Sequence, residues 1–107
     1  MAGTDTITIY RGEDITLTFT MSPVVDITGY TITFSVEGLN STKLIDEVLG
    51  TVTDGPNGEF TVALTDAETE SIAPGYYIYD AWRTDSGSER VLAAGTFIVL
   101  DSARMPV

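Results

Sequence analysis

The sequence contains no cysteine and no histidine. Without cysteine the fold cannot depend on disulfides, so it is compatible with a reducing compartment. Together the two absences exclude Ser-His-Asp and Cys-His nucleophilic catalysis and the usual zinc sites. We therefore expect a protein that is not an enzyme and that has no metal and no cofactor.

Positive charge is also scarce. Sixteen Asp and Glu stand against five Lys and Arg, which gives a net charge of −11. Nucleic acids and anionic membranes are bound by clustered Lys and Arg, so we expect neither as a partner. The acidity has two open explanations, solubility or a contact with a basic partner. The cations are scattered singly, as Arg11, Lys43, Arg83, Arg90 and Arg104.

Long apolar runs are missing as well, and the first residues do not resemble a secretory signal. No run approaches the roughly 20 apolar residues that span a bilayer. Met1–Asp5 is small and polar rather than basic and then apolar. It therefore differs from a secretory signal, and we expect the chain to fold in the cytoplasm.

The length and the hydrophobic content suit one domain. The chain has 107 residues, of which 43% are hydrophobic. This is enough for one core, and it argues against disorder. We expect a single domain over residues 1–107, with a core over about 6–100 and flexible tails at 1–5 and 102–107.

Alternation of apolar and polar residues dominates what is present. In Asp14–Met21 and again in Gly29–Glu37, apolar residues alternate with Thr or Ser. This period of two predicts half-buried strands with one face in water. Gly38–Asp46 is open between an extra edge strand and a loop. The other predicted strands are Thr6–Tyr10, Val48–Thr53, Glu59–Leu64, Gly75–Thr84 and Glu89–Leu100.

Turns and one helical turn complete the predicted fold. The turn cluster Asp54–Gly58 predicts a hairpin between its flanking strands. Thr65 and Glu68 fit a capping box at the start of a short helix, after which Ile72 is placed to contact the core. The prediction is an all-β protein, an immunoglobulin-like antiparallel β-sandwich of about seven strands with one short helical turn.

Two resemblances extend this prediction. Gly75-Tyr76-Tyr77-Ile78-Tyr79 resembles the Gly-x-Tyr-x-Cys start of strand F in immunoglobulin-like domains, with Tyr79 at the Cys position. This resemblance implies that Tyr77 is a structural tyrosine-corner residue, which bonds back to the preceding loop.

The second resemblance covers about 90 residues and is to phage virion proteins. The Arg11–Asp14 segment between two strands, Asp26–Phe34, Gly75–Tyr77 and Gly95–Val99 resemble, in this order, the N-terminal domain of phage baseplate upper proteins. The resemblance implies a virion structural protein of the head, neck or tail (baseplate). It would act as an assembly or decoration module that contacts other virion proteins, with a homo-oligomer possible. Its location would be the virion, after folding in the host bacterial cytoplasm.

A candidate interface follows from strand parity. If Tyr77 and Tyr79 point inward, the alternate residues of the two last strands form an outward apolar face. Two alternatives remain open, namely reversed parity and a loop Gly38–Leu49 that covers this face. The candidate interface residues are Tyr76, Ile78, Trp82, Arg83, Leu92, Ile98 and Leu100.

Other sites are weighed against turn and cap chemistry. Asp54 with Asn57 and Glu59, and Asp66 with Glu68 and Glu70, offer oxygen ligands for calcium but lack EF-hand spacing. Turns and helix caps explain these residues, so we expect no metal. No two carboxylates are placed for glycoside hydrolysis. Trp82 and nearby tyrosines could act as stacking platforms for a sugar, so the alternative function is a carbohydrate- or receptor-binding module. Open edge strands and the two tails offer further contacts with other chains.

Overall fold

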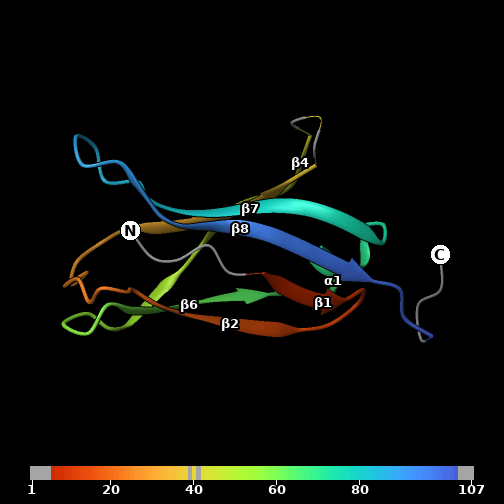
Figure 1. The fold of residues 1–107 in the computed structure, drawn as a ribbon, viewed down its shortest axis with the longest axis horizontal. Helices are drawn as coiled ribbons and strands as arrows, with labels where there is room; N and C mark the ends of the chain where they lie inside the picture. Colours follow the sequence, from red (N-terminus) through yellow and green to blue (C-terminus); the bar gives the residue numbers. More distant parts are fainter. Residues whose placement is uncertain (1–5, 39, 41, 104–107) are drawn as a thin grey trace.

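Two β-sheets packed face to face form the protein (Figure 1). The computed structural model describes residues 6–38, 40 and 42–103. The predicted tail 1–5 and residues 104–107 of the predicted tail 102–107 lie outside the described residues, whereas Ser102 and Ala103 follow the last strand. The elements in chain order are β1 (Ile7–Tyr10), β2 (Ile15–Thr20), β3 (Ile32–Glu37), β4 (Lys43–Leu49), β5 (Thr51–Asp54), β6 (Glu59–Leu64), α1 (Asp66–Glu70), β7 (Gly75–Arg83) and β8 (Arg90–Leu100).

The sheet order is that of an immunoglobulin-like sandwich. One sheet runs β1-β8-β7-β3-β4 and the other β2-β6-β5. Neighbouring strands are antiparallel except β1 and β8, which are parallel. β2, β6 and β5 correspond to strands B, E and D, and β3, β7 and β8 to strands C, F and G. The predicted fold class is confirmed, with eight strands described rather than about seven.

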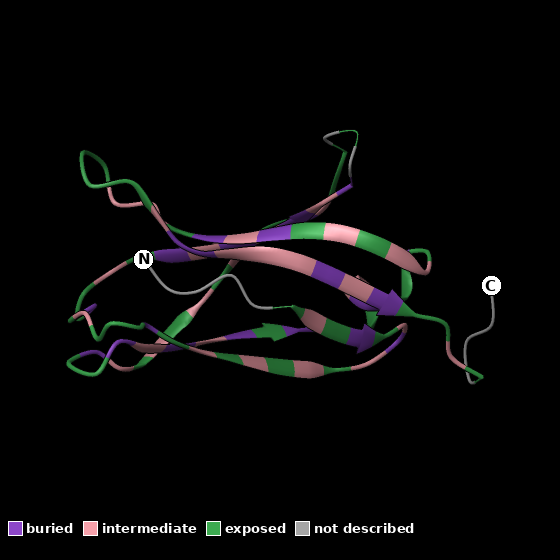
Figure 2. Cartoon of the chain, in the orientation of Figure 1, coloured by how far each residue is buried: buried purple, intermediate pink, exposed green. Residues whose placement is uncertain are grey.

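The core lies between the two sheets and follows the predicted alternation (Figure 2). Along β3 the inward residues Ile32, Phe34 and Val36 are buried, and the residues between them are half-buried. Phe19 of β2 stacks on Phe60 of β6 with ring centroids 4.9 Å apart. Each fully buried side chain, such as Phe34 or Phe60, contributes roughly 1.5–3 kcal/mol through its removal from water.

The predicted strand Val48–Thr53 is wrong as a single element. β4 ends at Leu49 in the five-stranded sheet, and β5 begins at Thr51 in the three-stranded sheet. Gly50 makes the crossing, where its N–H donates to the Ile32 carbonyl at 2.8 Å. A Cβ at this position would lie 3.2 Å from the Thr61 carbonyl oxygen, so a side chain would crowd the passage. The edge-strand alternative for Gly38–Asp46 is confirmed, because β4 starts at Lys43.

The predicted capping box at the start of α1 is confirmed. The Glu68 N–H donates to Thr65 Oγ1 at 3.3 Å, and the Thr65 N–H donates to Glu68 Oε1 at 2.9 Å. Ile72, just after the helix, is buried in the core as expected. Among the described residues, the structure contains no helix long and apolar enough to cross a membrane.

The turn after β1 is tied to this helix. Arg11 donates from Nη2 to the Glu70 carbonyl at 2.8 Å and from Nε to the Ile72 carbonyl at 3.1 Å. At the other end of α1, the Asp66 N–H donates to Asp14 Oδ1 at 2.7 Å. A cation at the last carbonyls and a carboxylate at the first N–H both complement the helix ends. The Arg11–Asp14 segment therefore has a structural role in the fold.

Candidate functional site

The outer face of the five-stranded sheet carries most of the exposed large apolar side chains. Seven such side chains are exposed among the described residues, and six project from this sheet. The seventh, Val24, lies between β2 and β3. An exposed apolar set of this size is characteristic of interaction surfaces. The six are Tyr10, Leu49, Tyr76, Ile78, Trp82 and Leu100.

Strand β7 supplies the centre of this face, with the parity that the sequence suggested. Tyr76, Ile78 and Trp82 are exposed, whereas Tyr79 and Ala81 are buried. Tyr77 is half-buried, and its hydroxyl donates to the Ala73 carbonyl in the loop before β7. This bond gives Tyr77 the geometry of a tyrosine corner.

Leu92 was expected on the same face, and this expectation is wrong. Ala81 pairs with Ala93 but Trp82 pairs with Val91, so the β7–β8 register shifts by one residue at this point. Leu92 is the extra residue, and it turns into the core, where it is 1% exposed beside buried Ala93. A bulge of this kind reverses strand parity beyond it, and alternation within one strand cannot reveal it.

One end of the outer face is aromatic and aliphatic. Tyr10 of β1 lies opposite Leu100 of β8. In the next row Ile98, which is half-buried, lies between Thr8 of β1 and Tyr76 of β7. We call Tyr10, Tyr76, Ile98 and Leu100 the apolar end. No charged residue is paired into these two rows.

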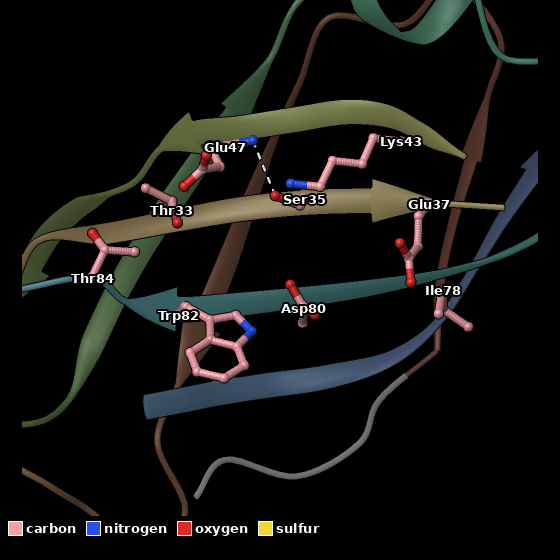
Figure 3. Close-up of a pocket in the computed structure, with 9 residues that line it drawn as sticks. All are labelled: Thr33, Ser35, Glu37, Lys43, Glu47, Ile78, Asp80, Trp82 and Thr84. Carbon is pink, nitrogen blue, oxygen red and sulfur yellow. Dashed lines mark hydrogen bonds between the residues drawn. The ribbon is translucent and has the colours of Figure 1, made fainter. Parts of the chain in front are cut away.

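The other end of the face is hollowed into a groove of about 300 Å³ (Figure 3). Trp82 forms part of it, with 41% of the residue exposed, and Asp80 and Ile78 precede it along β7. Carboxylates reach the groove from Glu37 of β3 and Glu47 of β4. The remaining lining residues are Thr33, Ser35, Lys43 and Thr84.

Strand β4 shapes the groove but does not cover the sheet. A bulge puts Glu47 at a φ of 51°, where its N–H donates to Ser35 Oγ at 3.0 Å. Lys43 Nζ lies 3.1 Å from Asp46 Oδ1, and this hydrogen bond raises the pKa of Lys43. Because β4 extends the sheet beside β3, the covering alternative for the Gly38–Leu49 segment is wrong for its described residues.

Arg83 is held in a structural cluster rather than presented outward. Its Nε lies 2.7 Å from Asp85 Oδ2, and its guanidinium carbon lies 3.9 Å from the centre of the Tyr30 ring. Asp85 also accepts the Thr31 N–H at 2.9 Å. The Arg83 hydrogen bond, followed by that from Thr31, lowers the pKa of Asp85 to about 2. Arg83 therefore joins the end of β7 to the start of β3.

The two acidic clusters considered for calcium are engaged in local turns and caps. Asn57 Nδ2 donates to Asp54 Oδ2 at 2.9 Å, and Thr53 Oγ1 donates to Glu59 Oε1 at 2.8 Å. Glu68 belongs to the capping box. Over the described ranges, no group of three or more acidic side chains is arranged to hold a metal ion.

Sequence reasoning missed several residues of the outer face. Alternation along β1 could have indicated that Tyr10 points outward, because its neighbour Ile9 points into the core. Leu49 and the groove residues Lys43 and Glu47 had no such signal, because they depend on the pairing of β4 with β3 and on its bulge.

Similarity to known proteins is found among solved structures. No family model and no curated protein matches the chain. Among solved structures, the chain is similar to the crystal structure of InlP from Listeria monocytogenes, with 18% identity and a TM-score of 0.47. The match covers 94% of this chain and 26% of that chain, so this chain spans about a quarter of the length of that protein.

Proposed function

We propose that the protein is a structural module of a phage virion that docks onto another virion protein through the outer face of its five-stranded sheet. The observation that carries the proposal is the concentration of six of the seven exposed large apolar side chains on this face. They lie outside the core that the inner faces supply. In water such a set is unfavourable unless a partner covers it.

The composition of the face supports a protein partner. Trp and Tyr are enriched among residues that anchor protein interfaces, and Tyr10, Tyr76 and Trp82 all lie here. Carboxylates of Glu37, Glu47 and Asp80 line the same groove as Trp82 and favour a partner with basic residues beside an apolar centre.

The virion context rests on the resemblance to phage baseplate upper proteins over about 90 residues. In this role the module folds in the host cytoplasm and then becomes part of the head, neck or tail. Its activity is docking, without a metal, a cofactor or a catalysed reaction.

Site-specific cross-linking in purified particles of the virus that encodes the chain tests this proposal. A photo-reactive residue at Tyr76 is expected to cross-link to another virion protein. The matched control is Ala63, which is exposed on the outer face of the three-stranded sheet. Absence of the chain from the particles contradicts the virion role, and equal cross-linking from both positions contradicts docking through this face.

The groove favours a second candidate, a carbohydrate-binding module. Trp82 beside hydroxyl and carboxylate groups offers a stacking platform with hydrogen-bond acceptors, which suits a sugar ring. Trp82 is the only tryptophan, so its fluorescence reports on the groove alone. Saturable quenching or enhancement by an oligosaccharide, lost in the Asp80→Asn variant, supports this candidate. Unchanged fluorescence across a panel of neutral and basic oligosaccharides contradicts it.

A further inference from the structure

Among the described strands, the two sheets leave four at their edges, and three of these edges are protected. Unpaired edge strands attract other chains, and proteins blunt them with bulges, charges or short strands. β4 has register shifts, Glu47 at positive φ and charged Lys43 and Asp46. β5 has four residues and a register shift before Asp54. β1 also has four residues, too few for a long template.

Strand β2 is the fourth edge, and it lacks these protections. Its six residues, Ile15–Thr20, pair with β6 in one unbroken register. The strand contains no charged residue, no proline and no glycine. Six residues in a strand extend about 20 Å. The edge is therefore regular, uncharged and long enough to accept another strand.

The backbone of β2 presents hydrogen-bonding groups to the open side. The N–H of Met21, directly after the strand, donates to the Gly58 carbonyl on the β6 side at 2.9 Å. Backbone groups of successive residues alternate in direction, so the odd-numbered residues of β2 face β6. Thr16, Thr18 and Thr20 consequently direct their N–H and C=O groups outward, and no other described strand pairs with them.

The side chains of β2 are also incompletely covered. Ile15, Leu17 and Phe19 point inward but are only half-buried. Their direct partners on β6, which has a strand on each side, are 0–2% exposed. An additional strand beside β2 would cover the apolar edge that is left open. These partners are Leu64, Val62 and Phe60.

We propose that β2 pairs with β2 of a second copy of this chain, antiparallel about a two-fold axis, to join two three-stranded sheets into one. For the inner faces of the two sheets to lie on the same side, odd-numbered residues of one β2 must lie opposite odd-numbered residues of the other. Centred on Leu17, this register sets Thr16 against Thr18 of the second copy. Ile15 then lies against Phe19 of the second copy, so the apolar faces are continuous.

A second copy meets the least electrostatic opposition at an uncharged edge. With a net charge of −11, two copies repel each other, and this repulsion is smallest where the contact surface carries no charge, as along β2. In the proposed register Asp14 lies opposite Thr20 of the second copy, and Glu13 opposite its Met21, so no acid faces an acid. Screening by salt reduces the remaining repulsion, and the dimer is expected to strengthen as salt rises. This inference concerns a different surface from the docking face and stands independently of the proposed function.

The first test is amide hydrogen exchange and light scattering of the unmodified protein over a concentration series. The mass is expected to rise from monomer to dimer between about 10 µM and about 1 mM, as suits an interface below standard size. The Thr16, Thr18 and Thr20 amides are expected to exchange about tenfold more slowly at the high concentration. The Leu17 and Phe19 amides, bonded to β6, serve as the internal control and remain protected throughout.

The second test is a matched pair of variants at Thr18. Thr18→Pro removes an outward N–H without taking a bond from β6, and the dissociation constant is expected to rise about tenfold or more. Thr18→Val keeps the N–H and the branched shape, so it is expected to dimerise like the unmodified protein. If Thr18→Pro does not fold, the exchange experiment decides the matter without it.

Three results overturn the inference. One is a monomer at about 1 mM with fast exchange at the three threonines. Another is slow exchange of these amides at every concentration, which would mean that a segment of the same chain covers the edge of β2. The third is a dimer that Trp82→Ala abolishes and Thr18→Pro leaves intact, which places the contact on the docking face.

Discussion

The two outward-facing sides of the sandwich differ although both are made by alternating strands. On the five-stranded sheet the outward positions hold Tyr10, Tyr76 and Trp82, together with aliphatic residues. On the three-stranded sheet they hold mainly threonine, as at Thr16, Thr18 and the opposing Thr61. Neither outward face belongs to the core between the sheets, so packing of that core does not account for their difference.

The comparison also separates two kinds of contact. The five-stranded sheet offers side chains across its face, whereas the three-stranded sheet offers backbone groups along β2 at its edge. A partner of the face is selected by side-chain shape and charge, and a partner of the edge by strand pairing. The two proposed contacts use different surfaces, so one would not block the other.

The inner faces provide the largest expected effect. Phe34 of β3 and Phe60 of β6 are both 0% exposed, one from each sheet. Phe34→Ala and Phe60→Ala are each expected to lower the free energy of unfolding by about 3–5 kcal/mol, measured by urea denaturation. A small loss at either position would mean that the corresponding sheet contributes little to the core.

Within β8, Leu92 at the bulge and Ile98 on the outer face are expected to differ in how much they contribute to the free energy of unfolding. Leu92→Ala is expected to cost about 2–4 kcal/mol of unfolding free energy, because Leu92 is buried by the bulge. Ile98→Ala, at a half-buried outward position, is expected to cost about 1 kcal/mol or less. Equal losses in parallel denaturation curves would contradict the register shift.

Trp82 tests whether the outer face is surface or core. Trp82→Ala is expected to lower the free energy of unfolding by about 1 kcal/mol or less, since 41% of Trp82 is exposed. Circular dichroism follows unfolding, because the variant has no tryptophan. In the same variant, the yield of cross-links from position 76 to another virion protein is expected to fall strongly, although the fold is retained. A loss of about 3 kcal/mol or more would assign Trp82 to the core.

The smallest effect is a pH dependence at the Arg83 cluster. Asp85 has a pKa of about 2 in the folded protein, against an ordinary value of 3.8. A carboxyl whose pKa is lowered by folding stabilises the protein above the unfolded value. This contribution is lost as the pH falls from about 3.8 toward about 2. Asp85→Asn removes this contribution, so the variant is expected to melt at a lower temperature than the unmodified protein above about pH 3.8. The difference between the two melting temperatures is expected to shrink as the pH falls toward about 2.

Much of the fold was predictable because its determinants are local. The alternation in Asp14–Met21 and Gly29–Glu37 predicted β2 and β3 with the correct inward residues. Thr65 and Glu68 predicted the capping box of α1. The candidate site was predicted less completely, because Leu92, Arg83 and the residues of β4 depend on contacts between distant segments.

The sequence by itself determined which side of each regular strand is apolar, because side chains alternate with a period of two. It also determined the turns, the helix cap and the absence of cysteine and histidine chemistry. Only the tertiary structure decided that Gly50 carries the chain between sheets, that a bulge buries Leu92 and that β2 is an edge among the described strands. Strand pairing joins residues far apart in the chain, and one bulge reverses parity, so neither can be derived from local alternation.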